Sequence, residues 1–173
     1  MFSALVNRLE RRPDWLEVAR RGAAFLAAHG RDAAGNWYTG LDRAGQPLAQ
    51  PRDPVCDCFA AMAFSQYALA AQDDGARDLA LETFRRILAR QGNPKGQYSK
   101  VVPATRPLRS LALPMILANL TLELEWLLDD ATLQRTLDQT RARYQHIAAE
   151  VSRQRADAAP RLSDAVTTAM QAE

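Results

Sequence analysis

The sequence predicts an all-α fold, a partial (α/α)6 toroid or barrel of alternating inner and outer helices with one short β-hairpin. Helical apolar patterns fill most of its 173 residues. Segments that are apolar on nearly every side alternate with segments that are apolar on one side. Two of the nearly all-apolar segments begin at Pro54 and Pro114, 60 residues apart. Since six such helix pairs would need roughly 360 residues, we expect less than half of a closed ring.

Residues 13–29 predict the first outer helix. Their apolar side chains recur with a helical period and include Trp15, Val18 and Phe25. Pro13 suits the first turn of a helix, and Gly30 follows its last residue. The next segment, GNWYTGLDRAGQPLAQ, has β-compatible residues on both sides of a turn over residues 42–45. We therefore expect a hairpin that pairs residues 37–41 with 46–49.

The next two segments predict an inner and an outer helix. Asp53 and Pro54 supply an N-cap and a first-turn proline for DPVCDCFAAMAFSQYALAAQ, which is apolar nearly all round and therefore buried. Residues 74–91 instead place apolar side chains on one face and charged ones on the other. That stripe comprises Leu81, Phe84, Ile87 and Leu88.

Residues 113–128 predict another inner helix, and residues 131–154 a last periodic helix. The polar, alanine-rich sequence from Arg155 offers little material for a core. We expect a helical domain over residues 1–140 and a helical or disordered tail over residues 141–173.

Composition and charge exclude several classes of function. The net charge of +2 gives no broad basic field for nucleic acid or an anionic membrane. No window approaches the roughly 18 apolar residues of a membrane span, and the N-terminal apolar run is too short for a signal peptide. Cys56 and Cys58 lie too close in sequence for an unstrained mutual disulfide, and further zinc ligands are few. We expect a soluble, cytoplasmic protein with reduced thiols, no metal, and no nucleic-acid or membrane partner.

The stretch NPKGQYSKVVPATRPLR, residues 93–109, is an unusually basic connection between two helices. It lacks the spacing of a P-loop. Four cations could still surround an anion, with Gly96 allowing close backbone approach. The alternative is a solvated loop whose prolines limit its entropy. The four cations are Lys95, Lys100, Arg106 and Arg109.

Three motifs in order resemble the N-acylglucosamine 2-epimerase family, which includes renin-binding proteins. They are GNWYTGLDRAGQPL, then DCFAAMAFSQYALA, then the run from TFRRIL through NPKGQYSK to TRPLRSLALPMILANLTLELE. The resemblance covers about residues 1–140. It implies an (α/α)6 barrel that epimerises N-acetylglucosamine and N-acetylmannosamine at C2 and requires no cofactor. It also implies ATP as an activator or stabiliser held by the basic loop.

The resemblance further implies a sugar cavity that opens where the inner helices begin. Two of the residues expected in its wall have a second interpretation. The carboxylate of Asp57 would stabilise a helix N-terminus whatever the function. Asn119 is polar within an apolar stripe, so its amide either bonds to backbone or faces the cavity. The expected substrate-cavity residues are Asp57, Cys58, Met62, Met115 and Asn119, with Cys56 beside them.

In this family the general base and acid are histidines from the second half of the barrel, helped by an arginine from an early inner helix. MFSALVNRLE resembles the middle and end of that helix, so the arginine would precede Met1. His29 and His146 lie elsewhere and are interpreted as helix-end or surface residues. We therefore expect no catalytic residue here and an incomplete epimerase that is inactive alone.

The alternative is a non-catalytic helical half-barrel for binding or oligomerisation. In both interpretations an open half-ring exposes a large apolar patch, which soluble monomers rarely tolerate. Both therefore predict self-association through the exposed inner helices.

Overall fold

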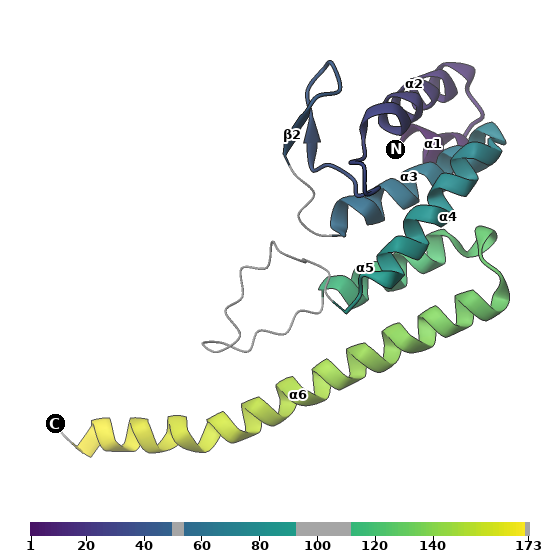
Figure 1. Cartoon of the computed structure of the whole chain (residues 1–173). Coiled ribbons are helices and arrows are strands. Elements are labelled where there is room, and N and C mark those ends of the chain that lie inside the picture. The colour runs from purple at the N-terminus through teal and green to yellow at the C-terminus, as the bar shows by residue number, and fades with distance from the viewer. Residues whose placement is uncertain (50–53, 93–111, 172–173) are drawn as a thin grey trace.

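A computed structural model describes residues 1–49, 54–92 and 112–171 of the chain. In these ranges six α-helices form three consecutive pairs, with a small hairpin between the first two pairs (Figure 1). The pairs are α1 (Phe2–Arg8) with α2 (Pro13–His29), α3 (Val55–Ala71) with α4 (Asp74–Ala89), and α5 (Ala112–Glu123) with α6 (Asp130–Gln171).

The first members of the pairs are the inner helices. α3 packs against both α1 and α5, while α2, α4 and α6 each pack on the helix before them. Most of the residues of α3 are buried, as its apolar sequence predicts, whereas α2 and α4 have charged outer faces. The predicted alternation of inner and outer helices is confirmed.

Local signals place the helix starts close to their predicted positions. α2 begins at Pro13, where the missing N–H costs no helical hydrogen bond. α3 begins at Val55, directly after Pro54; the predicted cap Asp53 lies outside the described residues. α4 is capped by Asp73, whose side chain accepts the N–H of Ala76 at 2.8 Å. The inner helix predicted over residues 113–128 is shorter, because α5 ends at Glu123 and a 3₁₀ turn, η2 (Glu125–Leu127), follows.

The hairpin is real but shorter than predicted. β1 (Gly40–Leu41) pairs antiparallel with β2 (Pro47–Ala49). Its turn is closed by the carboxylate of Asp42, which accepts the backbone N–H groups of Ala44 and Gln46. Trp37, expected in the first strand, instead turns into the core, and its indole N–H donates to Thr83. The backbone of Trp37 pairs with Arg31 in an isolated bridge and its N–H donates to Asp57, so the strand of the hairpin starts later.

The core consists of two clusters that meet along α3. The first joins α3 to α2, α4 and the buried Trp37. The second joins the other side of α3 to α4 and α5 through Cys58, Phe84, Leu117 and Leu120. α3 is therefore the central element of the described part of the chain.

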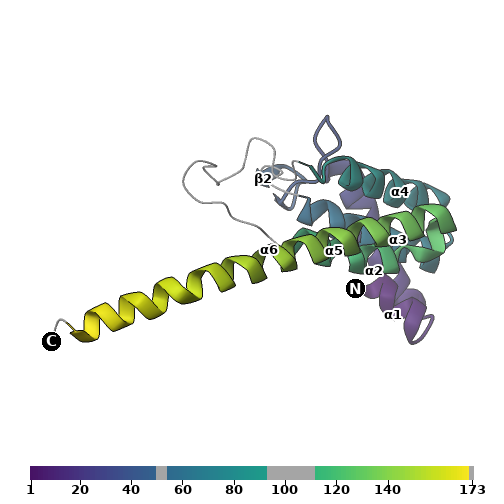
Figure 2. The same ribbon diagram turned by 90° about the horizontal axis from the view of Figure 1, so that it is seen from below.

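α6 is the longest helix and continues to Gln171. Its first half packs on α5 and buries Thr136, Thr140 and Ile147. Its C-terminal half extends away from the other helices (Figures 1 and 2). None of the described helices combines the length and the apolar character that crossing a membrane requires.

Candidate functional site

Both long inner helices leave a row of side chains uncovered. On α3, Phe59 is 65% exposed and is followed at helical spacing by half-buried Met62 and exposed Ala63. On α5, Met115 is 56% exposed, and Asn119 and Leu122 follow it one and two turns later. The α5 row lies opposite the leucines that pack into the core, and the α3 row lies opposite buried Ala61, Phe64 and Ala68. Each of these two helices therefore has a side on which a ligand or a protein partner can bind.

A cavity of about 640 Å³ opens between α1, α2 and α3. Its volume is in the range of small-molecule sites. The walls are largely apolar and include Phe59 and Met62 of α3 with Val18 and Leu26 of α2. Polar side chains of Arg8, Gln66 and Glu123 line part of it. The arrangement suits a ligand with one apolar side and hydroxyl or amide groups on the other.

Polar side chains in and beside this cavity connect all three inner helices. The amide of Asn7 donates to the carbonyl and side-chain oxygens of Gln66 at 2.9 and 3.0 Å. The amide of Gln66 donates to Glu123 at 3.1 Å, and Arg8 forms a two-pronged ion pair with the same carboxylate. Indole Nε1 of Trp126 donates to Ser65 at 3.0 Å nearby. Since Asn7, Gln66 and Glu123 lie near the C-terminal ends of their helices, these ends are held at one level.

Asp57 lies at the opposite end of α3, in the first turn, and is 2% exposed. One carboxylate oxygen accepts the backbone N–H of Trp37 at 3.3 Å, and the other accepts Nη1 of Arg90 at 3.3 Å. The same Arg90 nitrogen also donates to the side-chain oxygen of Asn36. Asp57 thus joins α3, the segment before the hairpin and the end of α4.

Burial raises the pKa of Asp57 above its ordinary value, against the opposing effects of the Trp37 N–H and the positive charge of Arg90. Arg90 is partly exposed, which weakens its attraction for the carboxylate. The dominant cause is therefore the loss of water around the carboxylate.

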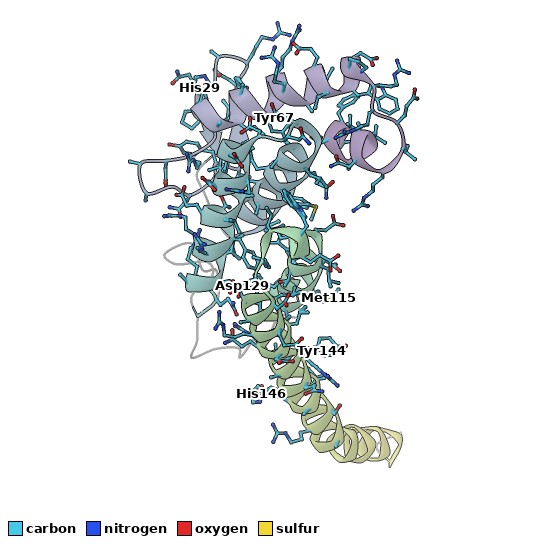
Figure 3. The ribbon with its side chains drawn as sticks, turned by 90° about the vertical axis from the view of Figure 1, so that its right-hand side faces the viewer. His29, Tyr67, Met115, Asp129, Tyr144 and His146 are labelled. Carbon is cyan, nitrogen blue, oxygen red and sulfur yellow. The ribbon has the colours of Figure 1, made fainter. Side chains whose placement is uncertain are left out.

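The other predicted cavity residues divide between the core and the open sides of the helices. Cys58 is fully buried against α4 and α5, and Cys56 is half-buried beside the first cluster. Met62 lines the cavity between α1, α2 and α3. Met115 and Asn119 lie together on the open side of α5, where Figure 3 labels Met115. Because Asn119 is exposed, the cost of a buried amide does not apply to it.

The predicted nucleotide contacts, Lys95, Gly96, Lys100, Arg106 and Arg109, lie outside the described residues. Nucleotide binding by these residues stays a prediction. Among the described residues, no group of three or more histidine, cysteine or acidic side chains is arranged to hold a metal ion.

Both histidines are on outer helices, at sites labelled in Figure 3. His29 ends α2 and packs against the ring of Phe25 and the turn at Gly45. His146 is exposed on α6, 3.9 Å from Glu150. Neither belongs to an inner helix, so the structure agrees with their interpretation as helix-end and surface residues.

Sequence reasoning missed the polar residues Arg8, Gln66 and Glu123. Gln66 interrupts an otherwise apolar helix pattern, and Glu123 lies between leucines in a second one. A polar residue in the second half of each of two inner helices was the available signal, since buried or half-buried polar groups need partners.

The chain matches the N-acylglucosamine 2-epimerase (GlcNAc 2-epimerase) family over residues 1–163, which extends past the boundary expected at residue 140. It is 29% identical over 129 residues to the N-acylglucosamine 2-epimerase of Bos taurus; the aligned region is 72% of this chain and 31% of the bovine protein.

Among solved structures, the chain is similar to cellobiose 2-epimerase from Spirochaeta thermophila DSM 6192, with a TM-score of 0.65 and 19% sequence identity. This match covers 80% of the chain and 39% of that epimerase, and it places the fold with the α/α toroids. The chain therefore spans less than half the length of either protein.

Proposed function

Because the chain belongs to the N-acylglucosamine 2-epimerase family, we propose that it forms part of the toroid and cavity wall of a sugar 2-epimerase. The proposed substrates are N-acetylglucosamine and N-acetylmannosamine. The observation that carries the proposal is the family match over residues 1–163. Similarity to cellobiose 2-epimerase supports the toroid fold. The proposed sugars are taken instead from the similarity to the bovine N-acylglucosamine 2-epimerase.

The open sides of α3 and α5 supply groups that suit a sugar. Phe59 and Met115 offer apolar surface for the C–H faces of a pyranose ring. Asn119 carries both a donor and an acceptor for hydroxyl or acetamido groups, and it is exposed beside Met115. In this proposal these residues bind and orient the sugar, and none of them moves the C2 proton.

Epimerisation at C2 needs a base to remove the proton and an acid to return one on the other face. Histidine suits both roles because its pKa lies near neutral pH. The two histidines of this chain are on outer helices α2 and α6, away from the open sides of α3 and α5. We therefore propose that the chain alone is inactive and that the acid and base belong to the part of the toroid that it does not span.

The proposal is tested with N-acetylglucosamine in heavy water, followed by proton NMR. Saturation transfer from the protein to the acetamido methyl group is expected, and it should weaken in Asn119→Leu but not in Leu48→Asp, a change on the hairpin. No deuterium should enter C2. Binding of neither hexosamine would contradict the substrate proposal, whereas C2 exchange by the chain alone would show that the acid and base are present.

ATP is proposed as an activator or stabiliser that contacts the basic loop, without being required for the chemistry. The four cations and Gly96 of residues 93–109 supply the chemistry of an anion site. ATP-dependent protection of Lys95 and Lys100 from an amine-reactive reagent supports this role. Equal labelling of both lysines with and without ATP contradicts it.

A second candidate function is a non-catalytic half-barrel that binds a protein partner or itself. The observation that favours it is the exposure of large apolar side chains on the inner helices, such as Phe59 and Met115. Both candidates predict self-association, so sugar binding separates them: binding of the hexosamine favours the epimerase proposal, and self-association without sugar binding favours this candidate.

A further inference from the structure

We propose that a cavity between α2, α3 and α4 binds a small organic ammonium ion, with its charged group between the carboxylate of Asp73 and the hydroxyl of Tyr67. The volume of this cavity is about 400 Å³, which is in the range of small-molecule sites. Phe59, Met115 and Asn119, which the proposed function assigns to the sugar, do not line it. The inference therefore does not depend on epimerisation.

The cavity exists because small side chains lie where the two outer helices face each other. α2 and α4 both pack on α3 but contact each other little. Their facing sides carry only alanine or glycine at several positions, and Phe64 of α3 and Leu79 of α4 add larger apolar walls. This lining suits the apolar body of a small ligand. The small residues are Ala23, Ala24 and Ala27 of α2 with Gly75 and Ala76 of α4.

Tyr67 supplies a free hydroxyl to this cavity. Its side chain, labelled in Figure 3, is only 8% exposed, yet its hydroxyl forms no hydrogen bond with another described residue. A buried tyrosine hydroxyl usually has a partner. Burial raises the pKa of Tyr67, and the negative charge of Asp73 raises it further, so this carboxylate lies close to the hydroxyl. The hydroxyl and the carboxylate can therefore reach the same ligand.

The turn between α3 and α4 fixes Asp73 beside the cavity. Gln72 follows α3 with a φ of 55°, and the backbone N–H of Asp73 donates to the carbonyl of Ala68 at 3.1 Å. Oδ1 of Asp73 caps α4 by accepting the N–H of Ala76 at 2.8 Å. Within the part of the chain that the structure describes, Oδ2 has no hydrogen-bond partner and is available to a ligand.

The charges around the cavity favour a cation. Among the described residues that line it, Arg20 and Asp73 are charged. Arg20 donates two hydrogen bonds to Glu17, at 2.8 and 2.9 Å, so its charge is already compensated. Asp73 forms no ion pair with another described residue. An ammonium group would pair with this carboxylate and lie against the aromatic ring of Tyr67.

The experiment is a titration of the full chain with n-butylammonium chloride at neutral pH, followed by the chemical shifts of the backbone amides in NMR spectra. The amide signals of Asp73, Gly75 and Ala76 should shift and saturate. n-Butanol and butyrate have apolar chains of similar length but lack the positive charge. Each should bind at least about tenfold more weakly, because charge-assisted hydrogen bonds are stronger than neutral ones.

Three variants test the two polar groups, with circular dichroism to confirm that each one folds. Asp73→Asn removes the charge but keeps a good N-cap, and it should weaken binding by at least about tenfold. Tyr67→Phe keeps the ring without the hydroxyl and should weaken binding by about two- to tenfold. Asp74→Asn removes the same charge from an exposed neighbour that pairs with Arg77, and this control should bind like the wild type.

Saturable binding that weakens in Asp73→Asn and not in Asp74→Asn supports the proposal. The absence of a saturable shift in the wild type, equal affinity for n-butanol, or unchanged affinity in either Asp73→Asn or Tyr67→Phe would each overturn it. Because no sugar is present, a negative result here leaves the tests of epimerase function unaffected.

Discussion

Asp57 is a buried carboxylate whose role in the fold differs from its expected place in a cavity wall. Its two oxygens accept hydrogen bonds from the backbone N–H of Trp37 and from the side chain of Arg90. Removal of the carboxylate takes this acceptor away from both donors. We predict that Asp57→Ala lowers the free energy of unfolding by about 1–3 kcal/mol. Urea denaturation measures this. Asp74→Ala, which removes an exposed carboxylate on α4, should change it by less than about 0.5 kcal/mol.

The raised pKa of Asp57 also predicts a pH effect. The folded state keeps this proton to a higher pH than the unfolded state, whose pKa is near the ordinary value of 3.8. As pH rises from that value through the raised folded pKa, the folded state therefore loses stability relative to the unfolded state. Asp57→Asn lacks the titration, so the stability of the wild type minus that of the variant should fall across this window.

Urea denaturation at closely spaced pH values checks this prediction. A difference that rises with pH would mean that Arg90 outweighs burial and lowers the pKa of Asp57 instead. At pH values above the raised pKa, the titration of Asp57 should no longer change the difference in stability between wild type and variant.

At the scale of elements, the inner helices are joined by a chain of side-chain hydrogen bonds. Gln66 is its middle member, since it accepts from Asn7 and donates to Glu123. Gln66→Ala should lower the free energy of unfolding by about 1–3 kcal/mol, because both neighbours lose a half-buried partner. Gln134→Ala at an exposed position of α6, where the amide donates to Asp138 one turn later in the same helix, should cost less than about 0.5 kcal/mol. Equal losses of unfolding free energy in the two variants would show that the hydrogen bonds of Gln66 between the inner helices add nothing to stability.

Gly22 in α2 and Gly45 in the hairpin turn predict opposite responses to alanine. Gly22 in the middle of α2 has open space around an added Cβ, so Gly22→Ala should raise the free energy of unfolding by about 0.5–1 kcal/mol. Gly45 has a φ of +85°, and a Cβ there would lie 2.4 Å from the His29 ring. Gly45→Ala should therefore be destabilising, by about 1 kcal/mol or more. Thermal unfolding of both variants gives the two signs.

The helices were predictable because their signals are local. Pro13 sets the start of α2, and the apolar period of residues 74–91 gives α4 its buried face. The predicted start of the first strand, at Trp37, was wrong. The side chain of Trp37 instead packs on Phe64 and donates to Thr83, and both residues are distant from it in sequence. Asn119 at the candidate site was also hard to predict. The sequence shows a polar residue within an apolar helical pattern, but its exposure depends on how α5 packs.

The whole molecule is an arc of three helix pairs with apolar side chains on its inner helices, as far as the described residues show. Its central helix α3 has neighbours on both sides, whereas α1 and α5 each have one inner neighbour. Solvation of Leu9, Met115 and Leu122 costs free energy that burial against another helix would recover. Assembly therefore bears on the stability of the whole arc as well as on any site inside it.

Mass action then links stability to concentration. If the folded chain dimerises and the unfolded chain does not, unfolding releases two monomers, so the unfolding temperature must rise with protein concentration. We predict this rise for the wild type by calorimetry over a wide concentration range. Leu122→Glu should unfold at a temperature nearly independent of concentration, while Leu48→Glu should follow the wild type. A wild-type unfolding temperature that is constant with concentration would mean that the arc folds alone and that self-association adds nothing to its stability.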